Sequence, residues 1–238
     1  MSVRPHRLCT LLLPLACLAA VPAPAETRVS ARGALDLGPQ AGEGFNLHVE
    51  RRDIDVVYDD GTGGDRLEVG RIGIGWSETL LPGLHLGIEG GRQELQQNGR
   101  SATAGRELTG YYGALTADTA WPLAEAAWLE VGARLAYSEV DDGGTTTVDI
   151  DWWSASLRPA LGLRLGDAVA LRAGVRAYWL DGDERVSDAG GGTTGLGEAD
   201  VGGAFVGLDV YTGNGGRVGV RADGGAVRAL RVVFERRY

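Results

Sequence analysis

The chain has no lysine, few aromatic residues and almost no cysteine or methionine. Among its 238 residues, two are Cys and one is Met, and both cysteines, Cys9 and Cys17, lie near the N-terminus. A disulfide scaffold or a cysteine-based metal site is therefore excluded from the rest of the chain. Charged residues make up only 23% and hydrophobic residues reach 44%, which excludes a disordered protein.

The N-terminal segment has the features of a secretory signal peptide. Residues 4–7 include two arginines and a histidine, residues 8–21 are mainly apolar, and the small residues Ala23 and Ala25 mark a cleavage site. A membrane anchor is the alternative, but a spanning helix needs about 20 apolar residues. We expect residues 1–25 to be removed after export.

The predicted mature chain is acidic. Residues 1–25 contain two arginines and no acid, so their removal changes the formal net charge from −9 to −11. Nothing forms the basic stripe that binding to the phosphates of a nucleic-acid backbone requires, so we expect no nucleic-acid partner. The acidic segments 59–65 and 181–184 lack the ligand order of an EF-hand, and solvated turns are the simpler interpretation. We expect no cofactor and no metal site.

From residue 44 onward the hydrophobic pattern has a period of two, which is typical of β-strands. In residues 127–140, for example, Leu129 and Leu135 lie on one face, and Glu130 and Arg134 lie on the other. Clusters of Gly, Asp and Pro separate ten such segments. The predicted strands are residues 45–58, 66–76, 84–95, 107–118, 127–140, 148–165, 169–180, 201–211, 217–223 and 226–238.

Two irregularities leave the strand count open. The apolar residues of segment 67–69 are out of phase with those of segment 72–76, which predicts a β-bulge near Gly70. Residues 27–37 also alternate, so the segment 26–43 is either an N-terminal segment without a strand or an extra strand. Barrels of eight or twelve strands are therefore alternatives to ten.

Compact and long connections alternate along the chain, which is typical of transmembrane barrels with short periplasmic turns and long outer loops. Strands of about 11 residues, tilted by about 40°, rise about 28 Å and cross an apolar band of about 25 Å. We therefore expect residues 44–238 to form an all-β domain, a closed antiparallel up-and-down transmembrane β-barrel. The compact turns are 79–83, 119–126, 166–168 and 212–216. The open loops are 59–65, 96–106 and 182–200, whereas 141–147 is shorter and 224–225 is a tight hairpin.

Aromatic residues near the strand ends favour a membrane barrel over a soluble barrel with the same period, because amphipathic rings suit the level of the lipid headgroups. In a membrane barrel the aliphatic stripes, which include Leu135 and Val175, face lipid, and the charged faces line the lumen. The aromatic residues in question are Trp76, Trp121, Trp128, Trp152, Trp153, Tyr178 and Trp179.

The last predicted strand carries the most specific signal. Leu230, Val232, Phe234 and Tyr238 share one face, and Tyr238 is the final residue. Here the chain resembles small bacterial outer-membrane β-barrels of the OmpA and OmpX transmembrane type, in which such a pattern is the barrel assembly signal. Arg236 departs from it, because an apolar or aromatic residue is expected there. The resemblance covers the architecture of the barrel domain and identifies no particular member.

The resemblance implies a location in the outer membrane of a Gram-negative cell. It also implies outer-membrane lipid, lipopolysaccharide and the barrel assembly machinery as partners. The oligomeric state is not indicated by the sequence.

Charged residues opposite the apolar stripes are expected to line the lumen as a charge network, with acids mainly on the first five strands and arginines mainly on the last five. Ion pairs that fill a narrow barrel are the simpler role, and a narrow water-filled path is the alternative. The predicted lumen residues are Glu50, Arg52, Glu68, Glu89, Glu107, Glu130, Arg134, Arg158, Arg164, Arg172, Arg176, Asp209, Arg217, Arg221, Arg231, Glu235 and Arg237.

An enzymatic barrel is a further class to weigh. His48 and His85 both lie near predicted periplasmic strand ends, away from the long loops, and no spacing marks Ser154 or Ser156 as an activated nucleophile. We expect no catalytic residue and a structural or surface-interaction role in the envelope. A narrow channel for small polar or anionic solutes is the second hypothesis, and a lipid- or peptide-hydrolysing barrel is the third.

Overall fold

A computed structural model describes residues 43–81, 83–97, 99, 105–143, 147–187, 191–212 and 215–238. The predicted signal peptide, with its cleavage residues Ala23 and Ala25, and residues 26–42 of the N-terminal segment lie outside the described residues. Within the described ranges, no helix is long and apolar enough to cross a bilayer.

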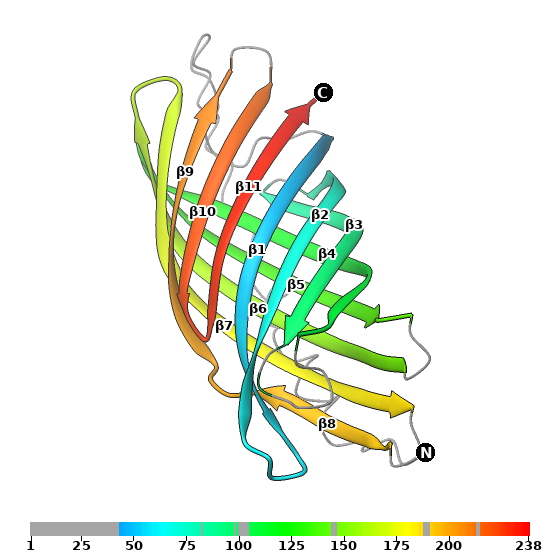
Figure 1. Ribbon diagram of the computed structural model, residues 1–238. Coiled ribbons are helices and arrows are strands. Elements are labelled where there is room, and N and C mark those ends of the chain that lie inside the picture. Colours follow the sequence, from blue (N-terminus) through cyan, green and yellow to red (C-terminus); the bar gives the residue numbers. More distant parts are fainter. Residues whose placement is uncertain are drawn as a thin grey trace.

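The described chain folds into eleven antiparallel strands (Figure 1), and all ten predicted segments are strands. Ten of them close into a ring, because β1 pairs with β2 on one side and with β11 on the other. The predicted up-and-down β-barrel is therefore confirmed. The strands are β1 Gly44–Tyr58, β2 Gly64–Leu81, β3 Leu84–Gln97, β4 Glu107–Ala124, β5 Ala127–Asp141, β6 Thr147–Leu165, β7 Val169–Ser187, β8 Thr193–Glu198, β9 Gly202–Tyr211, β10 Gly216–Gly225 and β11 Val227–Arg237.

The two ends of the barrel differ in their connections. The turn end contains the start of β1, the end of β11 and the short connections β2–β3, β4–β5, β6–β7 and β9–β10. The loop end contains the connections β1–β2, β3–β4, β5–β6 and β7–β8, together with the tight turn of the β10–β11 hairpin. The longer connections thus gather at one end, as the sequence predicts.

The barrel is narrower at the loop end. β7 pairs with β9 toward the turn end and with β8 toward the loop end, where β8 also pairs with β1 at Val56–Tyr58 (Figure 1). The ring of described strands therefore changes from ten strands to eight, because β8 takes the place of the shorter β10–β11 hairpin. The predicted loop 182–200 is wrong, since β7 continues to Ser187 and β8 occupies much of the remainder.

An apolar belt surrounds the outer wall of the turn-end part of the barrel. On β6 the outward side chains run from Trp153 to Leu165, which at about 3.3 Å per residue and a tilt of about 40° gives a rise of about 30 Å. Val175 on β7 also points outward and is 58% exposed. The aliphatic stripes therefore face outward, as expected. The belt that they form is tall enough to span the apolar band of a membrane barrel, about 25 Å.

The pattern reverses toward the loop end, where apolar side chains point inward and polar side chains point outward. On β1, Asp53 and Asp55 face outward and Ile54 and Val56 are fully buried. We call the resulting cluster the apolar plug. Its residues are Ile54, Val56, Tyr58, Leu67, Val69, Leu95, Leu108, Val140, Val148, Ile150, Trp152, Tyr178, Leu180, Leu196, Val227 and Ala229.

The reversal explains the phase change near Gly70, and the predicted bulge there is wrong. Gly70 pairs with Arg51 on β1 and with Glu94 on β3 in continuous register. The alternation of side chains is unbroken along this part of β2. What changes is the surroundings, since Leu67 lies in the apolar plug and Ile72 lies in the outer belt.

Not all of the predicted girdle aromatics face outward. Trp152 is fully buried in the apolar plug, whereas its neighbour Trp153 is 48% exposed on the outer wall. Adjacent residues of a strand must point to opposite faces, so only one of the two can belong to a girdle. Tyr178 lies in the plug and Trp128 is buried on the inward face of β5, so both were also wrongly predicted.

Candidate functional site

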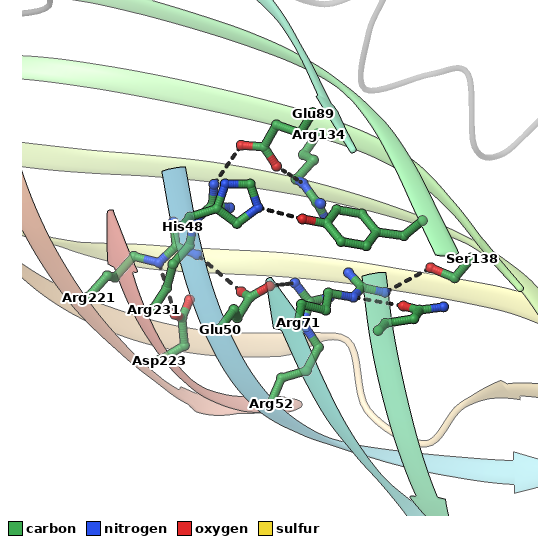
Figure 2. A network of polar contacts seen from close by, with 12 residues as sticks. His48, Glu50, Arg52, Arg71, Glu89, Arg134, Ser138, Arg221, Asp223 and Arg231 are labelled. Atoms are coloured by element: carbon green, nitrogen blue, oxygen red, sulfur yellow. Dashed lines mark hydrogen bonds and ion pairs between the residues drawn. The ribbon is translucent and has the colours of Figure 1, made fainter. Parts of the chain in front are cut away.

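The lumen between the apolar plug and the turn end holds the charged side chains. Inward positions of all ten ring strands contribute to it, because the side-chain period of two places every second residue inside. Two regions follow one another along the axis. A central network lies next to the plug (Figure 2), and a polar cavity lies nearer the turn end.

His48 is hydrogen-bonded through both ring nitrogens, and Figure 2 shows its bond to the tyrosine hydroxyl. The hydroxyl of Tyr112 lies 2.5 Å from Nε2, and Oδ1 of Asn46 lies 3.0 Å from Nδ1. Since the Asn46 oxygen only accepts, Nδ1 donates to it and Nε2 accepts from Tyr112. Gly73 makes this approach feasible, because a Cβ at this position would overlap the Tyr112 hydroxyl.

Carboxylates in the network each bridge two arginines. Glu89 accepts from Arg134 at 3.1 Å and from Arg231 at 2.6 Å (Figure 2). Asp223 accepts from Arg176 at 3.1 Å and from Arg221 at 2.9 Å. Charge-assisted bonds of this kind offset the cost of burying both signs of charge.

Glu50 and Arg71 connect the network to the plug side of the lumen. Glu50 is buried and accepts a hydrogen bond from Arg52, the neighbouring inward residue of β1. Arg71 donates to Gln93 at 2.9 Å and to Ser138 at 2.7 Å, and its guanidinium lies 4.6 Å from the centre of the Tyr112 ring. The contacts of Arg71 therefore join side chains of β2, β3, β4 and β5, and Figure 2 shows its bond to Ser138.

A second series of ion pairs runs around the turn end. Arg172 lies 3.4 Å from Glu130 and 2.8 Å from Asp209, and Arg217 lies 3.3 Å from Asp209 and 2.5 Å from Glu235. The series therefore links β5, β7, β9, β10 and β11. It fixes the inner wall next to the cavity through alternating charges.

The turn-end cavity has a volume of about 200 Å³. Its wall contains the ion pairs of the turn end together with Asp118, Arg158, His85 and small residues such as Gly132. Drug-sized ligands occupy pockets of about 300 to 1,000 Å³, so this cavity suits a smaller molecule or a few water molecules.

The structure places two predicted lumen residues on the outer wall. Glu68 and Glu107 point outward, and Glu68 lies 3.2 Å from Arg51 on the same face. The wrong prediction for Glu68 follows from the supposed bulge. Glu107 points outward because the next residue, Leu108, points inward into the apolar plug. The other predicted residues point inward, namely Glu50, Arg52, Glu89, Glu130, Arg134, Arg158, Arg164, Arg172, Arg176, Asp209, Arg217, Arg221, Arg231, Glu235 and Arg237.

Sequence reasoning missed several members of the network. Arg71 was overlooked because the supposed bulge concealed its phase, although the outward series from Ile72 implies that Arg71 points inward. Asp223 shares the inward face of β10 with Arg217 and Arg221, so strict alternation would have identified it. Asp118 lies on the face of β4 opposite to Glu107, so the wrong prediction for Glu107 concealed it. The Tyr112–His48 contact joins β4 to β1, and no local pattern predicts it.

The two histidines contact threonine, tyrosine and asparagine side chains. His85 Nδ1 lies 3.1 Å from the Thr79 hydroxyl at the turn end, and the His48 nitrogens contact Tyr112 and Asn46. Ser154 and Ser156 are buried on the inward face of β6. Among the described residues, no group of three His, Cys, Asp or Glu side chains is arranged to hold a metal ion.

The predicted assembly signal lies on the outer face of β11 and at the residue after it. Leu230, Phe234 and Tyr238 are exposed, and Val232 points to the same side. β11 pairs with β1 from Gly44 through Ile54, so this face continues the apolar belt across the closure of the ring.

No protein-family model matches the chain, and no curated protein matches it. Solved structures of outer-membrane proteins do. The translocator domain of autotransporter NalP from Neisseria meningitidis is 13% identical, with coverage of 86% of this chain and 91% of that chain and a TM-score of 0.47. Outer membrane protein AlkL is 15% identical, with coverage of 92% and 96% and a TM-score of 0.47. Outer membrane protein OprG from Pseudomonas aeruginosa is 11% identical, with coverage of 84% and 99% and a TM-score of 0.44. The likeness of this chain to small outer-membrane β-barrels concerns the fold alone.

Proposed function

We propose that the protein is a non-conducting outer-membrane barrel with a structural or surface-interaction role. The observation that carries the proposal is the apolar plug, whose side chains close the lumen at the narrower, eight-stranded end. A lumen of about eight strands is just wide enough for its own side chains. A plug of this kind would leave water and ions no continuous polar path through the described part of the barrel.

The proposed orientation has the turn end in the periplasm and the loop end outside the cell. The apolar belt occupies the turn-end part of the wall, so the loop-end part, with its polar outer face and apolar plug, would project beyond the bilayer. This projecting part would hold the long loops on a rigid support. Lipopolysaccharide and outer-membrane lipid would contact the belt, and the assembly machinery would read the exposed face of β11.

The orientation can be tested by cysteine labelling, since the predicted mature chain has no cysteine. A membrane-impermeant maleimide is expected to label Thr62→Cys, in the β1–β2 connection, on intact cells. Glu125→Cys, in the β4–β5 turn, is expected to react only after the outer membrane is permeabilised. The reverse pattern would contradict the proposed orientation.

The closed lumen can be tested in planar bilayers. The purified protein is expected to produce no channel steps, whereas a variant with Trp152→Ala and Leu196→Ala is expected to leak because two large plug side chains are removed. Trp153→Ala is the matched control, because Trp153 neighbours Trp152 but faces outward. Channel steps from the unmodified protein would overturn the non-conducting role and favour a narrow channel, the second candidate, for which the polar turn-end cavity would be the vestibule.

A further inference from the structure

The turn-end cavity has more positive than negative groups in its wall. Among the described residues that line it are six arginines and five carboxylates. Four carboxylates of the lumen, Glu89, Asp209, Asp223 and Glu235, each contact two arginines. Because arginines outnumber carboxylates and share them in this way, some arginines have no close carboxylate of their own.

Arg158 is the arginine of the cavity with the weakest ion pair. Among the described residues, its closest carboxylate contact is with Asp118, at 4.0 Å, which is longer than a hydrogen bond. The Nε of Arg158 is buried and has no hydrogen-bond partner among the described residues. A buried donor without a partner is unfavourable, more so when the group is charged, so a ligand that accepts from it would gain affinity.

A glycine lies between Asp118 and Arg158. Asp118 on β4, Gly132 on β5 and Arg158 on β6 are direct lateral neighbours, in that order. A Cβ at Gly132 would lie 2.6 Å from Oδ1 of Asp118 and 3.3 Å from Nη2 of Arg158. The absence of a side chain at this position therefore lets the Asp118 carboxylate and the Arg158 guanidinium face each other across Gly132, where both line the cavity.

Further arginines strengthen the positive potential around Arg158. Arg221 and Arg231 line the same cavity, and the charges of Arg158 and Arg221 repel each other. Arg164 is the inward residue of β6 closest to the turn end, and its buried Nε has no hydrogen-bond partner among the described residues. β6 thus presents two incompletely paired arginines between the turn end and the cavity.

We propose that the turn-end cavity is a binding site for a small oxyanion, a phosphate or carboxylate group, with Arg158 as its anchor. The planar guanidinium of Arg158 offers donors in the fork geometry that such groups match. Arg221 and Arg231 also line the cavity, where their ion pairs with Asp223 and Glu89 leave arginines in excess of carboxylates. Asp118 competes with the anion for Arg158, which sets the affinity. The site goes beyond the proposed function, since a closed barrel can bind an anion without conducting it.

Calorimetry on the full chain folded in detergent tests the site, with inorganic phosphate and acetate as probes at constant ionic strength. Saturable binding of one anion per chain is expected. Arg158→Gln is expected to weaken it by about tenfold or more, because a charge-assisted hydrogen bond contributes about 1.5 to 3 kcal/mol. Asp118→Asn is expected to tighten it, because the competing carboxylate is removed. Arg92→Gln, on the exposed outer face of β3, is the matched control and leaves binding unchanged.

The outcomes separate this proposal from general charge effects. Absence of saturable binding to the unmodified protein, or equal binding by Arg158→Gln, would overturn it. Asp118→Asn provides a readout with Arg158 in place, and failure of this variant to bind more tightly would also contradict the arrangement. Heat-modifiable migration on gels verifies that each variant is folded. The anion site and the non-conducting role fail independently, since calorimetry tests the first and bilayer recordings test the second.

Discussion

An arginine placed on the outer wall tests the reversal of side-chain pattern along the barrel. Ile74 on β2 lies in the apolar belt and is 54% exposed, whereas Val57 on β1 points outward near the loop end and is 44% exposed. Both are β-branched strand residues with outward side chains. Ile74→Arg and Val57→Arg therefore differ mainly in the surroundings of the new charge.

The expected costs differ with depth in the bilayer. An arginine near the bilayer midplane of a barrel costs about 2 to 4 kcal/mol, and one near the interface costs about 0 to 1 kcal/mol. We expect Ile74→Arg to lower the free energy of unfolding by at least about 2 kcal/mol more than Val57→Arg, a factor of about 30 in the folded-to-unfolded ratio. The reason is that only the guanidinium of the Ile74→Arg variant must move from water into lipid on folding.

The assay is urea unfolding of the barrel in lipid vesicles, followed by tryptophan fluorescence. Equal losses for the two variants would refute the placement of the belt, because both positions would then have the same surroundings. A larger loss for Val57→Arg would mean that the loop-end part lies in the bilayer. The unmodified protein supplies the reference free energy.

Two further variants test the central network. Glu89→Gln leaves both arginine partners of this carboxylate without a counter-charge, so we expect a loss of about 3 to 5 kcal/mol in unfolding free energy; a loss below about 1 kcal/mol would show that the network is well hydrated. Gly73→Ala adds a Cβ that overlaps the Tyr112 hydroxyl, and overpacking of this kind costs about 1 to 3 kcal/mol. Gly113→Ala is the control, since a Cβ there meets open space, and similar losses for both glycine variants would contradict the close packing around Tyr112.

The strand positions could be predicted from the sequence because alternation is a local property. Each strand carries its own apolar stripe, and most connections between strands contain Gly, Asp or Pro. The closure of the ring is consistent with Leu230 and Phe234, whose face continues the belt. Most inward charges followed from the same alternation, as for Glu89 and Arg158.

The reversal of the pattern could not be predicted from one strand alone. Leu67 and Ile72 are both apolar, and nothing in their types indicates that one lies in a plug and the other faces lipid. A bulge was the simpler explanation, and it misplaced Glu68. Trp152 and Trp153 present the same difficulty, because the sequence does not say which of the two ends in the plug.

Contacts between distant strands were also beyond local reasoning. β8 was assigned to a loop because its six residues, Thr193–Glu198, are mostly Gly and Thr. It is a strand because β7 on one side and β1 on the other supply hydrogen-bond partners. The Tyr112–His48 bond likewise depends on where β4 and β1 lie in the closed ring.

The length of the β10–β11 hairpin determines how far along the axis the lumen stays wide. The hairpin turns at Gly225, whose φ of 102° suits glycine, and Ala226 is tied to Gly202 by a backbone hydrogen bond of 2.8 Å. A hairpin extended by a few residue pairs would separate β8 from β1 and carry the ten-stranded cross-section through the level of the plug. The diameter of a barrel increases with its strand number. This one insertion would therefore open the closed loop end of the lumen without altering any residue that faces lipid.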